Sequence, residues 1–173
     1  MKQKLYVAAI IGWLFTFVLN LISAFGVDIA ERFPLVWIFF LTMFVLVIPT
    51  LFLAKNHPNI VEELDDMDDG IPLRPFFQDV EPWLGALVFV SVALAIAAFC
   101  MGTTQGYGQP EIVDGKFVLM KDSILIRTIP ADEYTRMKAG KLQIFSGVSL
   151  IFYALCILIL RRLIRWGTEK VVG

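Results

Sequence analysis

Four apolar stretches, each about as long as a membrane-crossing helix, divide this sequence. A helix that crosses a bilayer needs about 20 mostly apolar residues. The first three stretches, and the fourth as far as Leu160, contain no Asp, Glu, Lys, Arg or His. They therefore lack the polar face that a helix in a soluble bundle shows. We predict an all-α membrane protein, a four-transmembrane-helix bundle, with spans at residues 5–25, 34–54, 82–102 and 144–166.

The first span follows Lys2 and Lys4, as the core of a signal peptide also would. Its apolar run is longer than the roughly 7–15 residues of such a core. We therefore expect a retained helix, and we treat residues 1–173 as a single membrane domain.

Of the connections between the predicted spans, 103–143 has the sequence pattern of a folded element. Two β-rich runs, 116–120 and 124–129, flank Lys121-Asp122-Ser123. This pattern predicts a small extramembranous β-hairpin between the third and fourth spans. "GTTQGYGQP" before it is typical of loops, and "PADEY" after it predicts the start of a short helix along the membrane interface.

A two-stranded hairpin is barely stable alone in water. Its apolar side chains should therefore contact the membrane, the turn at 26–33 or another chain. The element is either a partner-binding surface or a simple lid on the bundle. The candidate interaction residues are Phe117, Leu119, Ile124, Ile126 and Tyr134.

The connection 55–81 contains "EELDDMDDG", six carboxylates in nine positions. If Gly70 is aligned with the glycine at position six of an EF-hand loop, Met67 and Phe76 fall at positions three and twelve, which require oxygen ligands. The stretch therefore does not match an EF-hand. We interpret the stretch as a short capped helix ending in a solvated acidic connection, with docking of a basic partner as the alternative. For a looser cation site, the only candidates are Asp65, Asp66, Asp68 and Asp69.

Composition supports the membrane prediction: 58% of the residues are hydrophobic and the mean hydropathy is +0.74. With four spans, both termini lie on one side of the membrane. That side carries eight Lys and Arg residues and the other seven. Basic residues close to the span ends decide orientation, and Lys2, Lys4, Lys55 and "RRLIR" all lie close. We therefore expect both termini and 55–81 in the cytoplasm and 103–143 outside it.

Small and polar residues recur at helical spacing inside the spans. Such residues let membrane helices approach closely and hydrogen-bond to one another. We interpret them as packing seams, although a polar pathway through the bundle is the alternative. The candidate packing residues are Gly12, Thr16, Asn20, Ser149 and Tyr153.

The run "DGKFVLMKDSILIRTIPADEY", followed by "FSGVSLIFY", resembles a pattern of small bacterial four-span membrane proteins that have no assigned activity. The resemblance is close over about a quarter of the chain and otherwise concerns the layout. The layout is also similar to that of four-span immunity proteins that protect bacteria against pore-forming bacteriocins. The resemblance to small bacterial four-span membrane proteins implies a location in the bacterial inner membrane.

Motifs for catalysis are absent from the sequence. His57 is the only histidine, the two cysteines are far apart, and no nucleotide-binding or serine-hydrolase motif occurs. Ion-coupled transporters usually keep ionisable residues inside the membrane. We therefore expect a non-enzymatic protein that has no cofactor and binds no nucleic acid. It should contact the lipid bilayer and either bind a protein partner or form a homo-oligomer. The alternative is an oligomeric small channel or transporter subunit.

Overall fold

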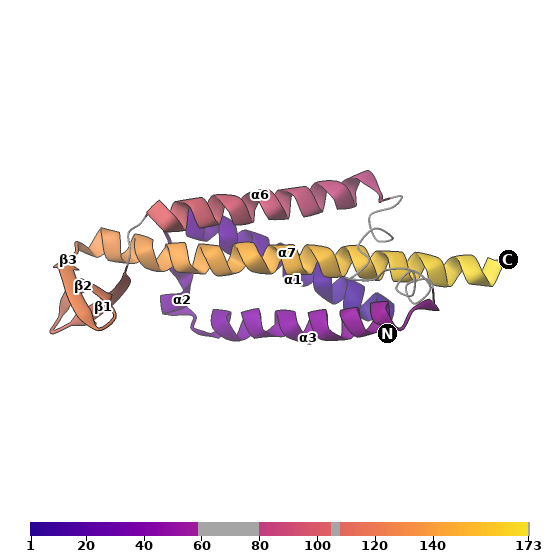
Figure 1. The fold of residues 1–173 in the computed structure, drawn as a ribbon, viewed down its shortest axis with the longest axis horizontal. Coiled ribbons are helices and arrows are strands. Elements are labelled where there is room, and N and C mark those ends of the chain that lie inside the picture. The colour runs from indigo at the N-terminus through magenta and orange to yellow at the C-terminus, as the bar shows by residue number, and fades with distance from the viewer. Residues whose placement is uncertain (59–79, 105–107, 173) are drawn as a thin grey trace, which may run out of the picture.

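The computed structural model describes residues 1–58, 80–104 and 108–172 (Figure 1). Among these residues, four helices are long and apolar enough to cross a membrane, which confirms that part of the prediction. The helices are α1 (Lys2–Ala24), α2 (Ile29–Arg32), α3 (Leu35–Lys55), α6 (Pro82–Thr104) and α7 (Ala131–Val172). The strands are β1 (Gln109–Val113), β2 (Lys116–Lys121) and β3 (Ile124–Thr128).

Helix α7 is the central element of the fold. Its 42 residues correspond to a length of about 63 Å at 1.5 Å per residue, roughly twice the thickness of a bilayer core. Helices α1, α3 and α6 each pack against it, with α6 and α3 along opposite sides in Figure 1. The sheet lies at one end of the molecule, and both chain termini lie toward the other.

The core follows the inner face of α7. Leu142, Leu150, Ile157 and Leu160 recur at intervals of eight, seven and three residues, and all are fully buried. The outward faces of α1, α3 and α6 are rich in exposed large apolar side chains. This arrangement is the one expected of a bundle whose outer surface contacts lipid.

The extramembranous element is a three-stranded antiparallel sheet in the order β1-β2-β3. The predicted hairpin is present as β2 and β3, but the sequence prediction missed β1. Asp114 and Gly115 join β1 to β2, and both have positive φ (51° and 74°). Positive φ at both central positions is typical of two-residue type I′ hairpin turns, for which Asp-Gly is a favoured sequence. Asp114-Gly115 was therefore a signal for the missing strand.

A second difference concerns the predicted short helix after Pro130. The chain does not form a separate helix there, because α7 continues from Ala131 through the last span without interruption. The helical spacing of apolar residues that begins at Tyr134 and Met137 continues into the last span. The first turn of α7 packs against the sheet in a small cluster formed by Leu119, Ile129, Tyr134 and Met137.

Candidate functional site

All five residues predicted to pack the helices are buried. Gly12 of α1 lies against the ring of Tyr153 in α7, so closely that a Cβ would be 2.4 Å from the ring carbon Cε1. Thr16 is fully buried, and its hydroxyl donates to the carbonyl of Gly12 at 2.8 Å. Ser149 is also buried and donates to the carbonyl of Phe145 at 2.8 Å.

Asn20 joins α1 to α7 by direct hydrogen bonds. Its amide Nδ2 donates to the Ser146 hydroxyl at 2.9 Å and to the Gln143 carbonyl at 3.0 Å. A buried amide that lacked these partners would carry a desolvation cost. Asn20 therefore holds two helices together, and its amide is directed at protein atoms.

Two further contacts connect the remaining helices. The Trp13 indole donates to the Ser91 hydroxyl at 2.8 Å, which joins α1 to α6. The Thr42 hydroxyl lies 3.4 Å from the Tyr153 hydroxyl, which joins α3 to α7. The buried polar groups described here thus bond to other helices or to the backbone of their own helix.

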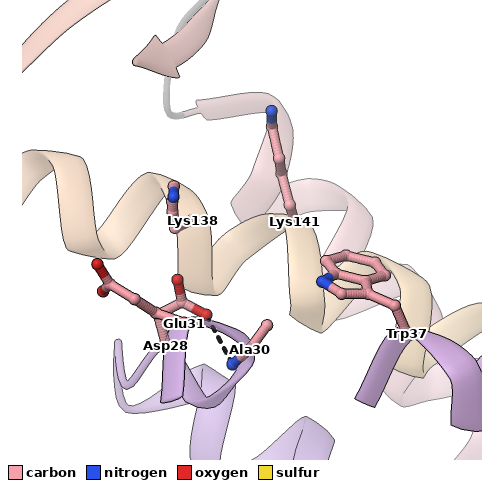
Figure 2. Close-up of a pocket in the computed structure, with 6 residues that line it drawn as sticks. All are labelled: Asp28, Ala30, Glu31, Trp37, Lys138 and Lys141. Atoms are coloured by element: carbon pink, nitrogen blue, oxygen red, sulfur yellow. Dashed lines mark hydrogen bonds between the residues drawn. The ribbon is translucent and has the colours of Figure 1, made fainter. Parts of the chain in front are cut away.

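The structure contains a pocket at the sheet end of the bundle, which we call the boundary pocket (Figure 2). Its volume is about 250 Å³, just below the roughly 300–1,000 Å³ typical of pockets for drug-sized ligands. It therefore suits a small group. The residues that line it are Asp28, Ala30, Glu31, Trp37, Lys138 and Lys141.

Three elements position the polar groups of the boundary pocket. Asp28 caps α2, and its carboxylate accepts a hydrogen bond from the Ala30 amide at 3.0 Å. The ammonium of Lys138 lies 4.9 Å from the centre of the Tyr134 ring. Figure 2 shows both lysines on α7, with Lys138 beside the carboxylates of Asp28 and Glu31, Lys141 extending away from them, and the Trp37 indole across the pocket. Within the part of the chain that the structure describes, no ion pair joins these lysines to these carboxylates.

The sequence prediction did not single out this pocket. Its residues come from two regions about one hundred positions apart, 28–37 and 138–141, so only the fold brings them together. Lys138 and Lys141 did recur at helical spacing with Tyr134. That period was the one sequence signal that pointed toward the pocket.

The structure divides the predicted interaction residues into two groups. Leu119 and Tyr134 are buried, and the Phe117 ring packs on the Tyr134 ring with centroids 4.7 Å apart. These three attach the sheet to α7. Ile124 and Ile126 are 69% and 47% exposed. Leu125 between them is also exposed, and we call these three consecutive residues of β3 the outer patch.

At the opposite end of the bundle, an ion pair joins α7 to the residue that precedes α6. Arg161 forms an ion pair with Glu81 at 2.7 Å, and the Trp83 indole donates to the same carboxylate at 2.6 Å. The hydrogen bond from Arg161 is the main cause, and the one from Trp83 the second, of a pKa of Glu81 below its ordinary value.

At the same end of the bundle, the His57 ring packs on Trp166 with centroids 4.9 Å apart. His57 is thus an aromatic packing partner at the end of the bundle.

The candidate cation ligands Asp65, Asp66, Asp68 and Asp69 lie outside the described residues. Within the described ranges, no three His, Cys, Asp or Glu residues are grouped as a metal site would require. Cys100 is exposed, Cys156 is buried, and the two are not joined in a disulfide.

Comparisons of this chain with family models, with curated proteins and with solved structures find no significant match.

Proposed function

We propose that this chain is an integral membrane protein of the bacterial inner membrane that works by binding another protein. Its role would be accessory, regulatory or immunity-type, without catalysis. The observation that supports this proposal is the outer patch. Ile124, Leu125 and Ile126 are consecutive, apolar and exposed, on a strand whose five residues are all exposed. Exposed apolar clusters of this kind mark interaction surfaces.

The position of the sheet favours a partner over lipid as the binding surface. The sheet lies at the far end of the molecule, beyond the ends of α3 and α6 (Figure 1). Arg127, next to the patch, forms an ion pair with Glu133, as charged groups in water can. In this proposal both termini lie in the cytoplasm, and the patch is available outside it.

Strand geometry favours contact through side chains over the addition of a strand from a partner. β3 is an edge strand, and edge strands can pair with other chains. However, Leu119 pairs with Arg127 and Met120 with Leu125, so Ile126 is the extra residue of a bulge. A bulge disrupts regular strand pairing. The side chains of the patch, and not its backbone, would therefore provide the contact.

Site-specific crosslinking in native membranes tests the proposal. A photoreactive residue at Ile126 should crosslink a partner, whereas one at Val113, on the opposite edge strand, should not. Val113 is a matched control because it is also apolar and is 42% exposed.

A second arm uses Ile126→Asp, with Val113→Asp as the matched control. Ile126→Asp should abolish co-purification of the crosslinked partner while leaving membrane insertion intact. Equal crosslinking at both positions, or unchanged co-purification in Ile126→Asp, would count against the outer patch as the binding surface.

A further inference from the structure

The boundary pocket combines two cations, two anions and an aromatic ring in a volume of about 250 Å³. Lysine ammonium groups donate strong, charge-assisted hydrogen bonds to phosphate oxygens. Carboxylates only accept hydrogen bonds, and a primary ammonium offers three donors. The pocket is therefore chemically complementary to a group that contains both a phosphate and a primary amine.

An apolar stripe on α7 begins at this pocket. Lys141, Phe145, Val148 and Phe152 follow one another at spacings of four, three and four residues, so they lie on one face of the helix. The three apolar members are 52%, 45% and 37% exposed. The Trp37 ring meets Phe145 edge-on at 5.2 Å, which connects the pocket to the stripe.

The stripe runs along a helix that is apolar enough to cross a membrane, and the pocket lies at the polar end of its apolar segment. A ligand that fits both features has a charged headgroup and long apolar chains. We propose that the boundary pocket binds the headgroup of a zwitterionic aminophospholipid, whose phosphate contacts Lys138 and Lys141 and whose amine contacts Glu31 and Asp28. Its acyl chains lie against Phe145, Val148 and Phe152.

The charges explain the selectivity that this assignment predicts. The headgroup of phosphatidylglycerol has no amine, so it gives the carboxylates of Asp28 and Glu31 no ammonium to contact. A quaternary amine, such as choline, has no N–H to donate and usually binds in a cage of several aromatic rings. Among the described residues that line the boundary pocket, Trp37 is the aromatic one. Phosphatidylethanolamine should therefore bind more tightly than phosphatidylglycerol or phosphatidylcholine.

Native mass spectrometry of the detergent-purified full chain, titrated with each of these three lipids, tests the proposal. The wild type should bind phosphatidylethanolamine most tightly. Lys141→Gln should weaken that binding about tenfold, as expected for one lost hydrogen bond to a charged group. Lys116→Gln, which removes an exposed lysine from the sheet, should leave it unchanged. Circular dichroism confirms that each variant is folded.

Glu31→Gln tests recognition of the amine separately. It should reduce the preference for phosphatidylethanolamine over phosphatidylglycerol while total lipid binding persists. Equal binding of all three lipids by the wild type, or equal effects of Lys141→Gln and Lys116→Gln, would overturn the proposal.

Soluble phosphoethanolamine distinguishes a lipid ligand from a small soluble one. It should displace the lipid only at large excess, because it lacks the chains that contact the stripe. Displacement at concentrations comparable to that of the lipid would overturn the lipid assignment and indicate a soluble phosphate ligand.

Discussion

Helices α6 and α7 are both long and strongly apolar, yet their surroundings are opposite. In the apolar segment of α7, 67% of the residues are buried, against 17% in α6. Helix α7 contacts each of the other three spans, whereas α6 packs mainly on α7. The apolar content of a membrane helix therefore does not indicate whether the helix is central or peripheral.

Side-chain size and polarity at the contacts do distinguish the two helices. Gln143, Ser146 and Ser149 are buried polar residues of α7, and the buried Tyr153 hydroxyl lies beside Thr42. In the described part of α6, Ser91 is the buried polar residue. Lipid solvates apolar surface as well as protein does, so small residues and hydrogen bonds determine which helices pack.

Matched glycine substitutions test this difference most strongly. At Gly12 an added Cβ would overlap the buried ring of Tyr153, whereas at Gly85 of α6 it would meet nothing within 4 Å. We expect Gly12→Ala to lower the free energy of unfolding by about 1–3 kcal/mol, the usual cost of overpacking. Gly85→Ala should leave it unchanged or raise it by up to about 1 kcal/mol. SDS titration in mixed micelles, followed by circular dichroism, measures both.

Equal losses in the two glycine variants would mean that α7 is not the tightly packed centre. Tyr153→Ala provides an internal check. In that background the space beside Gly12 is open, so Gly12→Ala should lose most of its effect. A full effect that persists without the ring would contradict the overlap as its cause.

Hydrogen bonds between helices give the next largest expected effect. Asn20→Leu removes both bonds from α1 to α7, and we expect a loss of about 1–2 kcal/mol in the same titration. Ser91→Ala removes the acceptor of the Trp13 indole between α1 and α6. Its effect should be smaller, because Trp13 is half-buried and retains some access to its surroundings. A larger loss for Ser91→Ala would reverse the assigned order of the two interfaces.

The sequence predicted the four helices well because apolar runs without charge leave few alternatives. The bounds of the first three predicted spans lie within three residues of those observed. The small and polar stripes also selected residues that are buried, including Asn20 and Tyr153. Both kinds of prediction depend on local patterns that the chain carries regardless of its tertiary structure.

Features that depend on distant contacts were missed. The boundary pocket requires Asp28 and Lys138 to meet, and no local pattern encodes that. The apolar rows of the hairpin did not reveal which side chains face α7, because the bulge at Ile126 shifts the alternation. Leu119 of β2 packs against α7 and is buried, whereas all five residues of β3, Ile124 among them, are exposed.

The smallest expected effect concerns the ionic attachment of α6 to α7. The Arg161 guanidinium holds the pKa of Glu81 below its ordinary value of 4.5. A carboxyl whose pKa is lower in the folded state stabilises the fold fully above that ordinary value, and the stabilisation disappears as the pH falls through the lower, folded-state pKa.

The thermal midpoint of the wild type should therefore fall in acid below about pH 4.5, and Glu81→Gln should lack this component. Because the side chains of Arg161 and Glu81 are still 41% and 29% exposed, the contribution of the pair is small, as for surface ion pairs in general. In an Arg161→Gln background, Glu81→Gln should change the acid profile little. If the wild type and Glu81→Gln lose stability in parallel, the α6–α7 attachment depends on packing alone, and the Arg161–Glu81 ion pair has no energetic consequence.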